Sequence, residues 1–543
     1  MASDVVDPRR LIRNTAVSLG GTAVLLTLLI GASRLMGLVR TIVIAHQFGQ
    51  DWQTDCYVAA FNIPEFFYFL LSGGALATGF VPVFTGYLVN DQDDRAVKTF
   101  RVLFTYLVMV LAIVIAIAWV FAPQLVAWAE PGFRNDVDKM ELTVFLARIL
   151  LPAQLVFLVG GLFWGTLNSL RYFAVPAFQP ILYNLFIIVG AVVGAHTKLG
   201  VSGMAFGALA GSIVAVVLIQ APFVATRGVS FKPSFSRRDK GFRQVLGLVL
   251  PVIFGLSVLQ INAILLPRSF GSFLGEGGIT AIECANRLMQ LPVGLFGMSL
   301  AIALFPTLSE RAAVNDHAEL RRYIESVLRI VLLLTVPSAV ILMVVRIPLI
   351  SLLFEHGEFG ADDTARTAVV LLFYTIGIPA MACQGIVARG FYALKDTWTP
   401  VKVGVCAVAL ALALNCMIYY CGWLEGRWLA LSASAVAVAN VFCLMILMNR
   451  RLVDFGIRRL IKLFVTAVLS STVAGGAAWG LGVIIGRAGV AQSGAIKFLH
   501  VLAPIGIAIS VYILLLWVIR VPELDQTLRR FRAWIDRRKK EKK

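Results

Sequence analysis

Charged residues are scarce in this chain. They make up 14% of the 543 residues, whereas soluble domains carry about 25%. Apolar residues make up 59%, and the mean hydropathy is +0.85. These values exclude an ordinary soluble enzyme and a disordered protein, and they indicate that most of the chain lies in a lipid bilayer.

Motifs for metal, redox and nucleotide chemistry are missing from the sequence. The seven cysteines form no CxxC pair, and nearly all fall in apolar runs, which is typical of packing residues. The five histidines form no HExxH motif, and no GxxxxGK[ST] loop occurs. We therefore expect no metal site, no cofactor and no nucleotide-hydrolysing motor in this chain.

Long apolar runs recur along the sequence. A helix that crosses about 30 Å of hydrocarbon needs about 20 mostly apolar residues, and fourteen stretches meet this requirement. They lie at about residues 16–45, 55–88, 100–122, 142–168, 176–195, 201–225, 244–266, 278–308, 326–350, 368–392, 400–422, 428–448, 460–485 and 499–519. The sequence thus predicts an all-α polytopic membrane protein with fourteen transmembrane helices.

The basic residues, which give a net charge of +18, are unevenly distributed between the spans. Of the 48 lysines and arginines, 33 fall in alternate connections and in the two termini, which the positive-inside rule assigns to the cytoplasm. This bias predicts an even number of spans with both termini cytoplasmic. It also argues against nucleic acid as a partner. The two densest basic segments, residues 226–243 and 520–543, are expected to be solvated and attracted to anionic lipid.

The sequence contains an internal duplication. The shift that places Pro82 on Pro306 also places Pro176 on Pro400, and further matches occur in other spans. Six spans separate the copies, so we expect two pseudo-symmetric six-helix lobes with a site between them near the middle of the bilayer. The predicted divisions are an N-lobe (1–225), a basic cytoplasmic linker (226–243), a C-lobe (244–448), a C-terminal helix pair that forms a lipid-facing groove (449–519) and a basic cytoplasmic tail (520–543).

Several ionisable residues lie inside predicted spans, where each is costly unless it faces water or a partner. Arg34 and Arg40 are in the first span and Arg287 is in the eighth. Together they predict a cationic cavity, because arginine stays charged and binds phosphate through two parallel hydrogen bonds. The alternative for Arg287 is an ion pair with Glu283, four residues earlier on the same helix.

Two acidic residues belong to the second span. Asp55 opens it, and Glu65 lies deeper. Asp55 is expected either to cap the N-terminus of a helix or to close an outer gate against an arginine of the opposite lobe.

Particular segments resemble the MurJ/MviN family, the lipid II flippases of the MOP exporter superfamily. The segments are SRLMGLVR (33–40), QTDCYVAAFNIPEF (53–66), GALATGFVPVF (74–84), ANRLMQLPVGLFGMSLAIALFPTLS (285–309) and GFYALKDTWTPVK (390–402). The resemblance implies a monomeric transporter in the bacterial cytoplasmic (inner) membrane. It would move lipid II, the undecaprenyl-pyrophosphate-linked disaccharide-pentapeptide, to the outer leaflet for peptidoglycan synthesis. It also implies a substrate site at Ser33, Arg34, Arg40 and Arg287, and a gate at Asp55 and Glu65.

The chain departs from the family pattern at four positions. Thr41 stands where the family commonly has aspartate, Glu65 and Tyr68 where it often has asparagine and arginine, and Gly73 where glutamate is common. The cavity is therefore expected to be less densely charged than in relatives. Spans seven and eleven carry no acidic residue, so a sodium site is not supported and the membrane potential could drive transport.

Two other functions compete with this interpretation. One is a MOP-type exporter of another polyprenyl-linked glycan or of small molecules. The other is an integral-membrane glycosyltransferase, which would need catalytic carboxylates on external loops. The candidates there are Glu130, Asp136, Asp138, Glu355, Glu358, Asp362 and Asp363, with His356. We expect these to be solvated loop charges.

Overall fold

The computed structural model describes residues 19–66, 75–249, 266–301, 304, 308, 311, 316–452, 455–487 and 494–521, and every regular element among them is helical. Contacts divide the chain into two compact units. Unit 1 is Met1–Thr280 with Gly357–Phe359, and unit 2 is Ala281–His356 with Gly360–Lys543.

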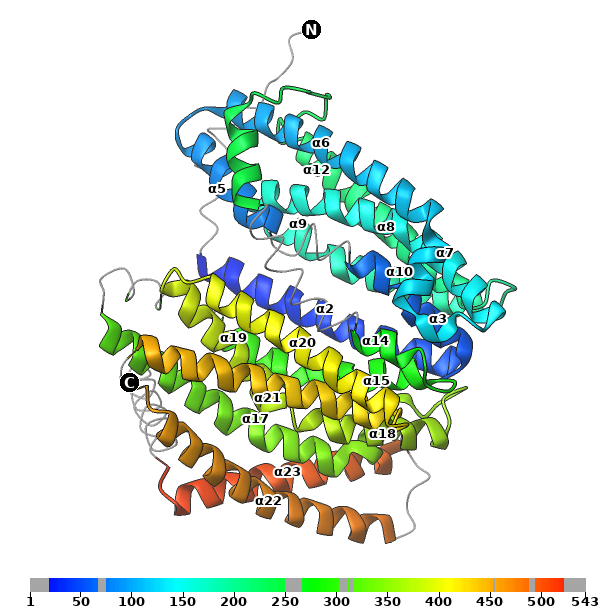
Figure 1. The fold of residues 1–543 in the computed structure, drawn as a ribbon, viewed down its shortest axis with the longest axis vertical. Coiled ribbons are helices and arrows are strands. Elements are labelled where there is room, and N and C mark those ends of the chain that lie inside the picture. The colour runs from blue at the N-terminus through cyan, green and yellow to red at the C-terminus, as the bar shows by residue number, and fades with distance from the viewer. Residues whose placement is uncertain are drawn as a thin grey trace, which may run out of the picture. The chain divides into compact units, whose positions relative to one another are not determined.

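Unit 1 is built mainly from the first half of the chain (Figure 1). Its elements are α2 (Leu19–Phe48), α3 (Trp52–Ala60), α5 (Ala75–Val89), α6 (Asp93–Val120), α7 (Ala122–Ala129), η1 (Pro131–Phe133), α8 (Val137–Ser169), α9 (Ala174–Ala177), α10 (Gln179–Ala195), α11 (Ser202–Ser212), the π-helical η2 (Ile213–Gln220), α12 (Ala221–Ala225) and α14 (Leu266–Gly271).

The second half begins with α15, whose first residues belong to unit 1. The elements are α15 (Gly278–Pro292), the π-helical η4 (Val293–Met298), α17 (His317–Phe354), α18 (Ala361–Thr375), α19 (Ile378–Ala393), α20 (Trp398–Tyr420), α21 (Gly426–Arg451), α22 (Ile457–Arg487) and α23 (Gly494–Val518). Helices α22 and α23 lie side by side and pack against α17 (Figure 1).

Many of these helices are suited to a bilayer. Among the described residues, nine are long and apolar enough to cross a membrane, and ten if the bent pair α18 and α19 counts as one span. The other four predicted spans (16–45, 55–88, 244–266 and 278–308) each include residues outside the described part of the chain. The all-helical membrane fold is therefore established, and the count of fourteen remains a prediction.

The helix boundaries repeat at the offset found in the sequence. Helices α6 and α8 begin at Asp93 and Val137, and α17 and α18 begin at the equivalent positions of the second copy, His317 and Ala361. Even an unusual turn repeats, because Arg171 and Lys395, which the same offset relates, both have positive φ angles, of 64° and 60°. The duplication thus fixes backbone conformation as well as sequence.

The two copies differ in the middle of one span. Helix α8 is continuous over 33 residues although it contains Pro152. The equivalent span bends by 45° between α18 and α19. Pro379 lies in the first turn of α19 and has no N–H to donate to the carbonyl of Thr375, so the hydrogen-bond ladder is interrupted there.

The basic linker, residues 226–243, lies along α6. Arg101 Nε donates to the Lys232 carbonyl at 2.9 Å, and Thr99 Oγ1 donates to Asp239 Oδ2 at 2.9 Å. Phe231 packs edge-on against Phe100. The side chains of its lysines and most of its arginines are exposed, as expected for a solvated segment, but its backbone is held in place.

Glycines allow α10 and α11 to approach closely. A Cβ atom added to Gly203 would overlap the carbonyl oxygen of Gly190, and one added to Gly207 would overlap the carbonyl oxygen of Phe186. Small residues at such spacing let membrane helices gain van der Waals contact that larger side chains would prevent.

Gly203→Ala should therefore lower stability, by about 1–3 kcal/mol, because the methyl group forces the two helices apart. The matched control is Gly506→Ala in α23, where an added Cβ meets nothing within 4 Å. Thermal unfolding in detergent measures both. Equal midpoints for the two variants would contradict the packing assigned to α10 and α11.

Candidate functional site

The predicted substrate residues of unit 1 lie on α2. Ser33 is half-buried and Arg34 is exposed. Arg40 is half-buried, and its buried Nε has no hydrogen-bond partner among the described residues. Six residues of helix separate the two arginines by about 240° and about 9 Å, which their long side chains can span. Thr41, the departure from the family pattern beside Arg40, is buried and donates to the Gly37 carbonyl at 3.1 Å.

Arg287, the third predicted substrate arginine, belongs to unit 2. Its Nη2 lies 3.0 Å from Glu283 Oε1 one turn earlier on α15, so the alternative interaction expected from the sequence is present. The Arg287 side chain is nevertheless 36% exposed. An ion pair this accessible to solvent is weak. Arg287 can therefore still attract an anion although it is paired with Glu283.

Asp55 binds the first turn of α15. Its Oδ2 accepts from the Gly277 N–H at 2.8 Å, and its Oδ1 accepts from the N–H and the hydroxyl of Thr280 at 2.8 and 2.7 Å. The carboxylate is 3% exposed. It therefore fills the open donors at a helix N-terminus, as the first alternative proposed, but the helix belongs to a distant part of the chain. The groups that fill its two oxygens come from Gly277 and Thr280, not from an arginine.

Glu65 belongs to a second set of contacts with the same segment. Arg268 Nη1 donates to Glu65 Oε2 at 2.7 Å and to Asn62 Oδ1 at 3.3 Å. Asn62 Nδ2 in turn donates to Glu130 Oε1. The side chains of Asp55, Asn62, Glu65 and Glu130, together with residues 268–280, are called the latch below.

Glu130 was expected to be a solvated loop charge, and this is wrong. It is 1% exposed, because the turn that follows α7 packs against residues 268–273. In that packing the Gly132 N–H donates to Ser272 Oγ at 2.9 Å. Burial raises the pKa of the Glu130 carboxyl to about 8, although the Asn62 hydrogen bond and the charge of Arg268 act in the opposite direction.

A turn from the second half of the chain also joins unit 1. The Glu358 N–H donates to the His46 carbonyl near the end of α2 at 3.0 Å, and Phe359 is 1% exposed. Gly357 has a φ angle of 65°, and a side chain there would collide with the His46 carbonyl. Glycine is thus required at this turn.

Several of the other carboxylates in the predicted external loops stabilise local structure. Asp136 caps α8 by accepting from the Lys139 N–H at 3.1 Å, and Glu355 accepts from the Thr364 hydroxyl at 2.8 Å. Asp363 accepts from the Gly360 N–H at 3.0 Å. These contacts give Asp136, Glu355 and Asp363 structural roles that need no catalysis.

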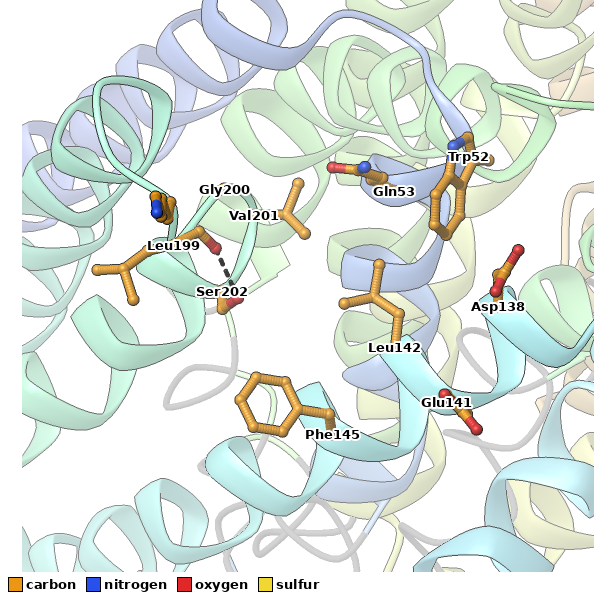
Figure 2. Close-up of a pocket in the computed structure, with 11 residues that line it drawn as sticks. Trp52, Gln53, Asp138, Glu141, Leu142, Phe145, Leu199, Gly200, Val201 and Ser202 are labelled. Carbon is orange, nitrogen blue, oxygen red and sulfur yellow. Dashed lines mark hydrogen bonds between the residues drawn. The ribbon is translucent and has the colours of Figure 1, made fainter.

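A pocket of about 660 Å³ opens between α3, α8 and the turn before α11 (Figure 2). Its lining includes Trp52, Gln53, Asp138, Glu141 and Lys198. None of the predicted substrate or gate residues lines it. Two carboxylates against one lysine make the pocket unsuited to a diphosphate. Among the residues that the structure describes, no group of three or more His, Cys, Asp or Glu could hold a metal ion.

Comparison with known proteins decides the family. Residues 44–499 match the family model described as lipid II flippase MurJ. The chain belongs to the MurJ family. A probable lipid II flippase MurJ of Buchnera aphidicola is 30% identical over 77% of this chain and 81% of its own length, and the lipid II flippase MurJ of Burkholderia cenocepacia is 32% identical over 69% and 73%.

Solved structures support the same fold. A lipid II flippase MurJ in an inward closed conformation superposes with a TM-score of 0.75 over 91% of this chain and 98% of that chain, at 24% identity. An inward-facing multidrug transporter of the MATE family superposes with a TM-score of 0.61 over 79% and 95%, at 15% identity. The predicted MurJ membership, the helical membrane fold and the transporter class are confirmed, and with them a multi-pass inner-membrane protein that is not an enzyme.

Some of the latch residues could be predicted from the sequence. Asp55 and Glu65 were predicted as gate residues, whereas Asn62, Glu130 and Arg268 were missed. For Glu130 a signal was available, because the repeat places Phe354 at the equivalent position. The MurJ-pattern departures at Tyr68 and Gly73 lie outside the described residues.

Asp55→Ala should release the segment that it caps, because three buried hydrogen bonds to a carboxylate are lost. Loss of even one such bond is worth at least about tenfold in local opening. Hydrogen exchange at the Gly277 and Thr280 amides measures this. The control is Asp51→Ala, since the Asp51 side chain makes no capping bond to α3. Unchanged exchange in Asp55→Ala would show that the cap does not hold the segment.

Proposed function

We propose that this protein carries undecaprenyl-pyrophosphate-linked peptidoglycan precursor, lipid II, from the cytoplasmic to the outer leaflet by alternating access. The observation that carries the proposal is the presence of Arg34 and Arg40 within the apolar 30-residue helix α2 of a MurJ-family chain. Arginines at this depth are costly, so they need a wet cavity or an anionic partner.

The charge of the substrate explains why arginines are needed. A diphosphate cannot enter hydrocarbon unless another polar environment replaces its hydration. Guanidinium groups supply this environment because each presents several N–H donors in a plane and keeps its charge at any depth. Arg34, Arg40 and Arg287 with Ser33 would hold the headgroup, and the substrate's negative charge would favour closure around it.

The prenyl tail needs no polar path. Helices α22 and α23 present large apolar side chains outward, including Trp479, which is 64% exposed, and Trp517, which is 58% exposed. A tail lying along this pair can stay in lipid while the headgroup crosses. Such a pathway is complete in one chain, so the protein would act as a monomer.

The distribution of basic residues favours an orientation with both termini in the cytoplasm. With that orientation, the end of α2, the start of α3, Glu130 and the turn at Gly357–Phe359 all lie at the outer face. The latch would then be the outer gate, with Asp55 and Glu65 in the roles predicted for them. Release of the headgroup to the outer leaflet would require the Asp55 and Arg268 contacts to break.

A related substrate is the second candidate. Thr41 is buried and hydrogen-bonded to its own helix at a position where relatives commonly have an aspartate. The proposed cavity therefore lacks one charge that could contribute to recognition of the headgroup. Another polyprenyl-linked glycan would share the diphosphate and differ in its sugars. A competition assay with both lipids in vesicles that contain the purified protein distinguishes the two.

Arg34→Ala and Arg287→Ala should each abolish growth when the native protein is depleted, because the headgroup loses a charge-assisted contact. Loss of one such contact costs about 1.5–3 kcal/mol, or roughly a tenfold to a hundredfold loss of transport. Arg34→Lys should retain part of the activity, since the charge remains but the paired hydrogen bonds do not.

The readout is the amount of lipid II accessible at the outer leaflet after depletion. Arg322→Ala is the control, because its side chain is 70% exposed and pairs only with Glu319 among the ion pairs described. Full complementation by both alanine variants would reject the cationic cavity. An unchanged outer pool on depletion of the protein itself would favour another substrate.

A further inference from the structure

Glu130 is a buried acid outside the membrane-spanning helices. It follows α7 in the connection between the spans Asp93–Val120 and Val137–Ser169. Its exposure of 1% is unusual for glutamate, which is almost never fully buried unless it is paired. The roles proposed for the predicted substrate residues do not explain why Glu130 is buried.

The bonding around Glu130 leaves its charge only partly compensated. Oε1 accepts from Asn62 Nδ2, while Oε2 is buried and has no hydrogen-bond partner among the described residues. The cation that acts on it is Arg268, whose Nη1 is already bonded to Glu65 and Asn62. An ionised carboxylate in this position would keep one oxygen without a donor.

The other charges near the latch increase the deficit of positive charge. Asp55 of α3 acts on Glu130 with like charge. Lys139, at the start of α8, acts on Asp55 and lies 3.6 Å from Asp136. Glu65 and Glu130 thus share Arg268, whereas the charge that acts favourably on Asp55 is that of Lys139. A proton on Glu130 is the simplest way to balance the group.

The internal repeat provides a comparison within the same molecule. Because the repeat relates the start of α6 to that of α17, and the start of α8 to that of α18, Glu130 corresponds to Phe354. Phe354 is completely buried at the end of α17. The fold thus accepts an apolar side chain at this position, so packing alone does not require the carboxylate.

We propose that Glu130 is a proton-binding residue of the latch, neutral while the latch is closed and ionised when it opens. On opening, the O–H bond at Oε2 breaks and the proton passes to water, while the carboxylate gains solvent. The inference rests on the outer-gate role proposed above for the latch. It makes a proton, and not only the membrane potential, a participant in the transport cycle.

The sign of the pH dependence follows from the direction of the shift. The pKa of Glu130 is about 8 when it is buried and would return toward its ordinary value of 4.5 in water. The closed latch therefore binds the proton more tightly than the open latch. Closure is therefore favoured at low pH. Between about pH 4.5 and pH 8 the equilibrium constant for closure falls roughly tenfold per pH unit, and above about pH 8 it no longer changes.

Infrared difference spectroscopy on the full-length protein in lipid nanodiscs tests protonation directly and needs no substrate. Between about pH 7 and pH 9.5, the wild type should lose the carbonyl band of one neutral carboxylic acid. Glu130→Gln, which keeps the shape without the acid, should lack this change. Glu141→Gln, an exposed acid of the same region, should retain it. Absence of the band from the wild type at about pH 7 overturns the proposal whether or not any variant folds.

Hydrogen exchange at the Gly132 amide tests the link to opening, because this N–H is bonded to Ser272 Oγ when the latch is closed. The ratio of wild-type to Glu130→Gln exchange, taken at the same pH, should rise roughly tenfold per pH unit and level off above about pH 8. Glu141→Gln should follow the wild type. A ratio that does not vary with pH overturns the proposal. A normal titration together with failed lipid II transport would count against the proposed function alone.

Discussion

A carboxylate bound to the N-terminus of a distant helix holds the latch together. Asp55 gives both oxygens to Gly277 and Thr280, and α15 begins between those residues. The open N–H groups and the partial positive charge of a helix N-terminus make such a contact strong when it is buried. It is also reversible, because water can satisfy both sides once they separate. Opening and closing can therefore depend on modest changes in charge nearby.

Charge divides the protein into two chemically different regions. Arg34 and Arg40 on α2, and Arg287 on α15, are the residues proposed to attract an anionic headgroup, whereas Asp55, Glu65 and Glu130 belong to the latch. In the closed state each latch acid is compensated differently. Asp55 accepts from donors at a helix N-terminus, Glu65 pairs with Arg268 and Glu130, as proposed, binds a proton. If the latch is the outer gate, as proposed, a diphosphate is then not repelled by its closed state. Ionisation on opening would make the exit unfavourable for its return.

The sequence predicted what depends on local pattern. The lengths of the apolar runs predicted the helices. The repeat that relates Pro82 to Pro306 also relates Asp93 to His317, and a helix begins at each of these two residues. Burial of Glu130 was not predictable from its neighbours, because a charge after a short apolar run looks the same whether solvent or another segment covers it. The partners of Asp55 likewise depend on tertiary contacts between segments that lie far apart in the chain.

The proposed gate role requires the latch to open when the headgroup leaves. Spin labels at Trp128→Cys and Gly275→Cys test it, since both positions are exposed. Trp128 precedes Glu130 in α7, and Gly275 belongs to the latch segment 268–280. Electron–electron distance measurements in nanodiscs should give one short distance without lipid II, and a second, longer distance should appear when lipid II is added. A single distance that is unchanged by lipid II, in a protein that still transports it, would contradict the account.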